Sequence, residues 1–219
     1  MDKDQAIADI VSIFSGYDSL WSSATSELES KKPGKLYELY VLTELLGNLR
    51  RRGFTISFVG SSIKFKASPG QIKLSDPHFH AVAPSGREFW IFVDIEFRTL
   101  GSEGHSAFDF SHLHELDIVV VDDTPPYPSY ANVALAIECK CVGNFEKQLI
   151  KEALGVRREL SLLTPFEQES ILSQESTGAS IEVRAEPASE FWLAFTDPKG
   201  TQYAMSPATF GIELRHIEP

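Results

Sequence analysis

Two apolar, β-branched runs that carry acidic side chains constrain the fold of this chain most. The first run covers residues 114–122 and contains Asp117, and the second covers residues 132–141 and ends in Glu138-x-Lys140. Alternate side chains of a strand share a face, so Glu138 and Lys140 are predicted to leave the same face of the second strand. Pairing of the two strands would bring two carboxylates and an ammonium together. We therefore expect a group of side chains suited to holding a hard divalent cation.

Composition favours a soluble, cytoplasmic protein. The chain has 219 residues, of which 42% are hydrophobic, enough for one sizeable core with an appended part. No run approaches the roughly 18 uncharged apolar residues of a membrane helix, and the N-terminus does not begin with a basic stretch and an apolar signal core. The only two cysteines, Cys139 and Cys141, lie two apart in a predicted strand, which suits buried thiols in a reducing compartment.

Charge is distributed unevenly along the chain. The net charge is -11, yet residues 31–66 carry +6 and residues 139–163 carry +2, while the intervening residues 67–138 carry -8. Basic segments therefore flank an acidic centre. This pattern is typical of a rim that binds a phosphate backbone around a carboxylate site, although solvated helix faces give the same pattern.

Hydrophobic periodicity predicts an α/β fold with a central mixed sheet flanked by helices. Apolar residues at helical spacing are followed by segments that alternate with a period of two, and an amphipathic helix follows the two acidic strands. The expected elements are helical segments within 3–29, a helix over 36–52 stopped by Gly53, a hairpin of 54–58 with 63–67, a strand within 88–100, the strands 114–122 and 132–141, a helix over 145–163, and a closing hairpin of 191–195 with 202–205.

Three parts of the chain follow from these elements. Residues 1–30 are predicted to form an N-terminal helical arm, and residues 31–163 the core. Residues 164–219 are predicted to form a C-terminal extension, with a polar and weakly periodic stretch at 164–187, whose hairpin completes the same domain.

The order of these features resembles the PD-(D/E)XK nuclease superfamily, the restriction endonuclease-like enzymes. The resemblance covers about residues 33–163 and depends on a helix with Glu38, a hairpin, a strand with Asp117, a strand with Glu138-x-Lys140, and an amphipathic helix. The residue before Asp117 is Leu116, where the superfamily's name has proline. The resemblance implies a restriction endonuclease-like core.

The resemblance also implies site residues. Asp117 and Glu138 would bind Mg²⁺, or Mn²⁺ as a substitute, and Lys140 would help to activate the attacking water. Glu38 would be an additional catalytic acid, although an acid near a helix start is also favoured by the helix dipole. Because Mg²⁺ prefers oxygen ligands, the backbone carbonyl of Cys139 is a further expected ligand.

Other side chains complete the predicted site. Glu115 shares a strand face with Asp117 and is a reserve ligand. The pair His112-x-His114 lacks a third ligand at a fixed spacing, which disfavours zinc. Basic side chains on the helix after the second strand are expected to contact phosphates, with solvated charge as the alternative: Lys147, Lys151, Arg157 and Arg158.

These residues together predict a Mg²⁺-dependent nuclease that hydrolyses phosphodiester bonds, most readily in DNA, with RNA left open. The functions of known members of the superfamily suggest that the protein is a component of a bacterial defence system, a restriction system or a mobile element. The alternatives are a noncatalytic nucleic-acid or protein-binding module that keeps the nuclease fold, and a metal-independent scaffold. The small size and acidic surface suggest a partner subunit that recognises the target, and a homodimer would suit an enzyme that cuts both strands.

Overall fold

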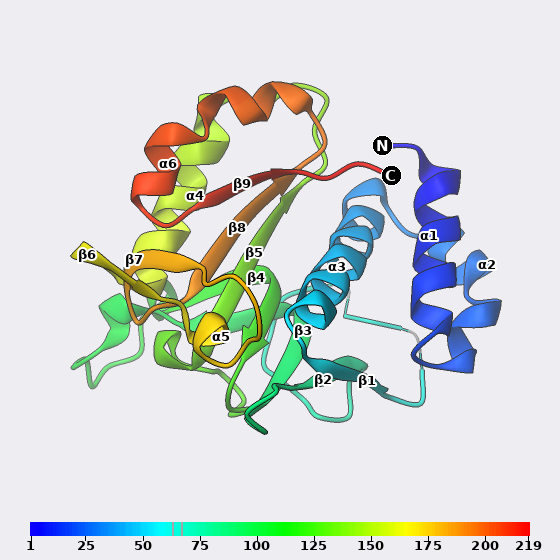
Figure 1. Ribbon diagram of the computed structural model, residues 1–219, viewed down its shortest axis with the longest axis horizontal. Helices are drawn as coiled ribbons and strands as arrows, with labels where there is room; N and C mark the ends of the chain where they lie inside the picture. The colour runs from blue at the N-terminus through cyan, green and yellow to red at the C-terminus, as the bar shows by residue number, and fades with distance from the viewer. Residues whose placement is uncertain (63, 67) are drawn as a thin grey trace.

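A computed structural model describes residues 1–62, 64–66 and 68–219 and shows one central sheet with helices on both faces (Figure 1). The α-helices are α1 (Lys3–Ser15), α2 (Thr25–Glu29), α3 (Pro33–Arg51), α4 (Lys147–Leu160), α5 (Ile171–Gln174) and α6 (Met205–Thr209). The 3₁₀ helices are η1 (Ser19–Ser23), η2 (Leu100–Ser102), η3 (Phe110–His112), η4 (Tyr130–Asn132) and η5 (Pro198–Tyr203). None of the described helices is long and apolar enough to cross a membrane.

The central sheet is mixed and mostly antiparallel. Its strands are β1 (Thr55–Val59), β2 (His78–Val82), β3 (Glu88–Arg98), β4 (Leu113–Val121), β5 (Val133–Lys140), β8 (Glu190–Phe195) and β9 (Glu213–His216), in the order β1-β2-β3-β4-β5-β8-β9. The first five strands are antiparallel neighbours, whereas β5, β8 and β9 are parallel. The strands β6 (Leu162–Glu169) and β7 (Glu182–Glu186) form a separate antiparallel pair. The predicted α/β class, with a mixed sheet flanked by helices, is confirmed.

Helix α3 and helix α4 cover opposite faces of the sheet and bury two separate cores. Leu42 and Leu46 of α3 pack in a cluster with Ile10 of α1 and Ile118 of β4. The second cluster joins α4 to the other face of the same strands. The N-terminal helices lie outside α3, and the two chain ends lie close together (Figure 1), where the Met1 ammonium is 3.3 Å from Glu218.

The predicted helix over 36–52 is confirmed as α3, and its end is built as the sequence suggested. Gly53 has φ +92°, its N–H donates to the Arg50 carbonyl, and the N–H of Phe54 donates to the Leu49 carbonyl at 3.1 Å. This is the Schellman arrangement, which favours glycine because L side chains are strained at positive φ. A Cβ at Gly53 would also lie 2.6 Å from Thr177 Oγ1.

Three expectations about strands are wrong. The strand of 54–58 does not pair with 63–67: β1 pairs with β2, Ile63 and Ala67 lie outside the described residues, and 64–66 are not in a strand. The segment 202–205 does not pair with β8, because it lies at the end of η5 and the start of α6; β9 instead adds in parallel at the edge of the sheet. The stretch 164–187, expected to be irregular, contains most of β6, with α5 and β7.

Candidate metal and phosphate site

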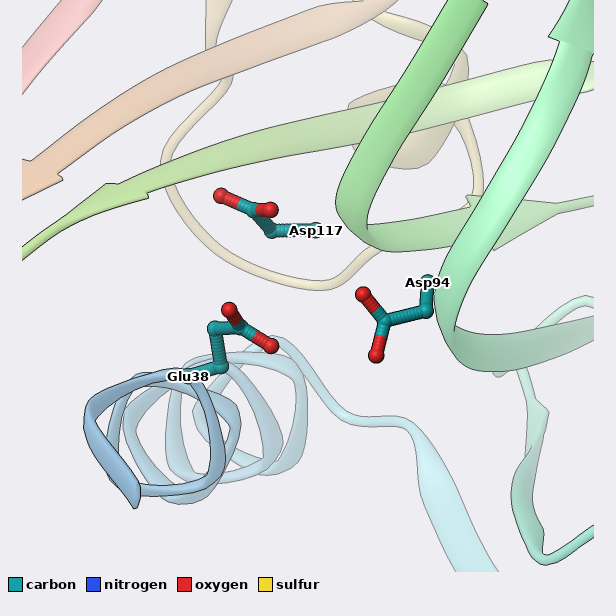
Figure 2. Close-up of side chains that lie close together, drawn as sticks. All are labelled: Glu38, Asp94 and Asp117. Atoms are coloured by element: carbon teal, nitrogen blue, oxygen red, sulfur yellow. The ribbon is translucent and has the colours of Figure 1, made fainter. Parts of the chain in front are cut away.

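Three carboxylates from three elements meet at one point of the fold. Glu38 comes from α3, Asp94 from β3 and Asp117 from β4, and ligand atoms of all three lie within 4.8 Å of one another. Figure 2 shows the three side chains close together, with Glu38 reaching from the helix toward the two strand residues. We call these residues the three-carboxylate cluster.

In β3 and β4 the alternation of side chains between the two faces of the sheet is interrupted at Asp94 and at Asp117. Val93 packs in the first core and Ile95 in the second, although strict alternation would put both on one face. Ile118 and Leu116 on β4 are divided between the two cores in the same way. Asp94 has φ +53°, a left-handed conformation that costs of order 1–3 kcal/mol for a residue other than glycine and that recurs at functional sites.

Burial favours the protonated form of all three carboxyl groups in this cluster. Glu38 is 8% exposed, and burial followed by the nearby Asp117 and Asp94 raises its pKa to about 8. Burial also raises the pKa of Asp94, which is fully buried, and that of Asp117. Three anions at this spacing repel one another, so the cluster gains from a cation or from protons.

Lys35 supplies one such cation. Its Nζ lies 2.5 Å from Asp94 Oδ1 and 3.0 Å from Glu38 Oε2, so the ammonium bridges two of the three carboxylates. Burial lowers the pKa of Lys35, but the two carboxylates raise it more, and the net shift is upward. Lys35 therefore stays charged and partly neutralises the cluster.

One oxygen of the cluster is left without a partner. Asp94 Oδ2 is buried and accepts no hydrogen bond within the described residues. A buried oxygen without a donor costs about 1–3 kcal/mol, so it needs a ligand or a proton. An all-oxygen donor set with such an atom fits a hard divalent cation, the preference of Mg²⁺.

Glu138 and Lys140 form a second group beside Asp117. The β4–β5 ladder pairs Ile118 with Ile137 and is not continued to Asp117 and Glu138. Lys140 Nζ donates to Glu138 Oε2 at 3.0 Å, which confirms that both side chains leave the same face of the strand. Glu138 nevertheless lies outside the three-carboxylate cluster, where Asp117 meets Glu38 and Asp94. Joint binding of a cation by Asp117 and Glu138 therefore stays a prediction.

The protonation of this second group is also shifted. Burial and the nearby Asp117 raise the pKa of Glu138 to about 7, against the opposing effect of Lys140. Burial lowers the pKa of Lys140, but Glu138 and Asp117 raise it more, so that the net shift is upward. At neutral pH Lys140 is a charged donor, while Glu138 is able to exchange a proton.

Cys139 faces Asp117 through its backbone. Its N–H donates to Asp117 Oδ2 at 2.7 Å. The N–H and C=O of one strand residue point to the same side, so the Cys139 carbonyl is directed toward the Asp117 side of β5. A Cys139 carbonyl that binds the cation, as the sequence predicted, would have to point in this direction. Burial raises the pKa of the Cys139 thiol well above its ordinary value, so this half-buried side chain, which packs against the first core, stays protonated and unreactive.

A cavity of about 470 Å³ opens onto Asp117, Glu138 and Lys140, and we call it the site cavity. Glu115, predicted as a reserve ligand, lines this cavity, and burial followed by Asp117 raises its pKa. Lys151 of α4 also lines it, which places one predicted phosphate contact at the site.

The other basic residues of α4 divide into two groups. Lys147 and Arg158 are exposed but do not line the site cavity. Arg157 is only 3% exposed, and its guanidinium donates to the Ser189 hydroxyl and carbonyl and to the Phe210 carbonyl. The expectation that Arg157 binds phosphate is therefore wrong, because its donors are used inside the protein.

A second cavity, of about 360 Å³, opens onto the other side of the three-carboxylate cluster. Glu38 and Asp94 line it together with four lysines, and we call it the lysine cavity: Lys31, Lys32, Lys35 and Lys66. The positive charge of residues 31–66 is thus partly gathered at the site. Arg52 is an exception, because it is buried against Glu190 at 2.8 Å.

Asp94 is the site residue that the sequence reasoning did not assign. It stands alone inside the run Phe92-Val93-Asp94-Ile95, and an ionisable side chain within a buried strand is costly unless it has a role. That anomaly was the available signal. Comparison with protein-family models, with curated proteins and with solved structures found no match to this chain.

Proposed function

We propose that the protein is a divalent-metal-dependent nuclease that hydrolyses phosphodiester bonds, with DNA as the leading substrate. The observation that carries the proposal is the position of Asp117. This residue belongs to the three-carboxylate cluster and also lines the site cavity with Glu138 and Lys140. A cation held by the cluster would therefore lie beside a charged lysine and an open space for substrate.

The arrangement of elements supports the same proposal. Helix α3 brings Glu38, the antiparallel strands β4 and β5 bring Asp117 and Glu138-x-Lys140, and α4 follows. This order agrees with the restriction endonuclease-like pattern on which the sequence expectation was based. A fold alone does not establish an activity, so the weight of the proposal stays with the site.

The residues have distinct roles in the proposed reaction. Asp94, Asp117 and Glu38 would hold the cation through carboxylate oxygens, and the Cys139 carbonyl is directed to join them. When bound, a divalent cation polarises the phosphate and lowers the pKa of a water. Lys140 would donate to a phosphate oxygen and stabilise the charge that develops there, because it stays protonated. Glu138, with a pKa of about 7, would exchange the proton.

The charges around the site suit a polyanion. The overall charge of -11 opposes binding to nucleic acid, but the lysine cavity brings positive charge to Glu38 and Asp94, and Lys151 brings it to the site cavity that Asp117 lines. Phosphate contacts by such lysines supply affinity without reading sequence. Target recognition would then come from a partner subunit or a second copy of the chain.

One observation favours a second candidate, a noncatalytic binding module. The Lys35 ammonium already bridges Asp94 and Glu38, so the acids have a neutralising partner without any metal. In that case the acids and lysines would serve structure, and the cavities would bind phosphate without cutting.

Cleavage assays separate the two candidates. Plasmid, linear duplex, single-stranded DNA and RNA are incubated with Mg²⁺, Mn²⁺ or EDTA, with Asp117→Asn and Lys140→Ala as site variants and Glu44→Gln, an exposed residue of α3, as the matched control. A nuclease cuts only with the divalent cation, loses cutting in both site variants and keeps it in the control. Binding of the substrates without cutting under any of these conditions contradicts the nuclease and supports the binding module.

A further inference from the structure

The loop that joins β3 to β4 presents two phenylalanines to solvent. Phe108 is 67% exposed and Phe110 is 92% exposed, and their rings meet edge to face with centroids 5.7 Å apart. Large apolar side chains are normally buried, and neighbouring exposed ones indicate an interaction surface. We call residues 99–112 the aromatic loop.

A cavity of about 360 Å³ lies against the aromatic loop. Phe108, His105 and His112 line it, with Arg98 and Tyr127, so its wall consists largely of planar groups. The His105 and His112 rings lie 5.5 Å apart. The volume falls within the roughly 300–1,000 Å³ of small-molecule pockets, which is enough for a nucleotide.

Hydrogen bonds fix the shape of the loop. The Thr99 N–H donates to the His112 carbonyl at 3.0 Å, which closes its base. The Asp109 carboxylate accepts from the N–H of Ser111 at 2.7 Å and so caps the short helix η3 that carries Phe110. The aromatic side chains are therefore held on an ordered backbone.

The loop is adjacent to the proposed catalytic site. Leu113 lines the loop cavity and the next residue, His114, lines the site cavity. A Cβ at Gly101 of η2 would lie 3.6 Å from Glu159, which also lines the site cavity. Asp117 is four residues along β4 from Leu113, or about 13 Å at 3.3 Å per residue.

We propose that the aromatic loop is a stacking site for an unpaired base of the nucleic acid whose backbone is cut at Asp117. The inference rests on the proposed function and narrows its substrate to one with a single-stranded segment. Bases stack on exposed aromatic rings regardless of sequence, and paired bases inside a duplex cannot offer their faces in this way. Arg98 at the cavity adds a positive charge for the phosphate of the stacked nucleotide.

The test measures binding of the full chain in EDTA, so that no cleavage interferes. Fluorescence anisotropy gives the Kd for a labelled oligothymidylate of about 20 nucleotides and for a blunt duplex of the same length. The variants are Phe108→Ala, Phe110→Ala and the control Phe166→Ala, whose side chain on β6 is 61% exposed. Thermal unfolding confirms that each variant folds.

Stacking of one base contributes about 1–3 kcal/mol, so the single-strand Kd is expected to rise roughly 5- to 150-fold in Phe108→Ala or Phe110→Ala. The duplex Kd should change less than about twofold, and Phe166→Ala should change neither. The slope of log Kd against log salt should stay constant, because no phosphate contact is removed.

Three results would overturn the inference: an unchanged single-strand Kd in both loop variants, an equal loss for duplex and single strand, or no binding of the single strand by the wild type. The first would instead favour a protein partner for the loop. Failure of the proposed function looks different, because metal-dependent cutting would be absent while single-strand binding still depended on Phe108 and Phe110.

Discussion

Replacing Glu38 by Gln should stabilise the protein at neutral pH and have little effect in acid. Glu38 is buried beside Asp94 and Asp117, and these surroundings raise its pKa from 4.5 to about 8. A carboxyl whose pKa is raised on folding stabilises the fold fully below pH 4.5, and that contribution is lost as the pH rises to about 8. Glutamine keeps the shape of the protonated acid and cannot ionise.

The size of the effect follows from the shift. At pH 7 the unfolded carboxyl is ionised, 2.5 units above its ordinary pKa, while the folded one remains mostly protonated. Each unit corresponds to 1.36 kcal/mol, so the wild type loses about 3 kcal/mol at pH 7 relative to strongly acidic solution. At pH 5 the same calculation gives a loss of stability of less than about 1 kcal/mol for the wild type. The free energy of unfolding of Glu38→Gln, relative to that of the wild type, should therefore increase by about 2–3 kcal/mol from pH 5 to pH 7.

Urea unfolding at pH 5, 6, 7 and 8, without divalent cations, measures this difference. Glu44→Gln, on the exposed face of the same helix, is the control and should show no comparable trend. A Glu38→Gln variant whose stability relative to the wild type is the same at every pH would refute the reasoning. Excess Mg²⁺ at pH 8 should stabilise the wild type, by about 2.7 kcal/mol at 100 times Kd, and the variant less.

Two further substitutions test other contacts. Lys35→Met removes the ammonium from the three-carboxylate cluster and should tighten Mn²⁺ binding at least about tenfold in calorimetric titration. The reason is that the ammonium repels the cation, and two unit charges near 4 Å interact by about 4 kcal/mol at an effective dielectric of 20. Weaker binding would mean that Lys35 does not compete with the cation. Arg52→Met leaves the buried Glu190 carboxylate without its cationic partner and should cost about 3–5 kcal/mol in urea unfolding, whereas the exposed Arg51→Met should cost little. Equal costs would contradict the role of the buried pair.

Local signals in the sequence predicted the elements that carry the site. Helical spacing and Gly53 located α3, and the apolar runs located β4 and β5 as neighbours in the sheet. The alternation within β5 placed Glu138 and Lys140 on one face, where they form an ion pair. Each of these predictions depends on a period within a single segment.

The missed features depend on contacts between distant segments. Asp94 joins the cluster because β3 changes phase there, and strict alternation gives no hint of that change. The parallel addition of β9 is decided by packing at the sheet edge. The burial of Arg157 could have been predicted in part, since it lies four residues from Ala153 on the apolar face of α4, but its partner Ser189 could not.

The proposed nuclease activity requires the three-carboxylate cluster to bind a divalent cation. Crystals soaked in Mn²⁺ and measured at an X-ray energy where manganese scatters anomalously test this claim most directly. We predict an anomalous peak at about 2.0–2.5 Å from oxygens of Asp94 and Asp117, with Lys35 displaced from between Asp94 and Glu38. A saturating soak that leaves Lys35 in place, with manganese absent from the cluster or bound elsewhere, would contradict the account.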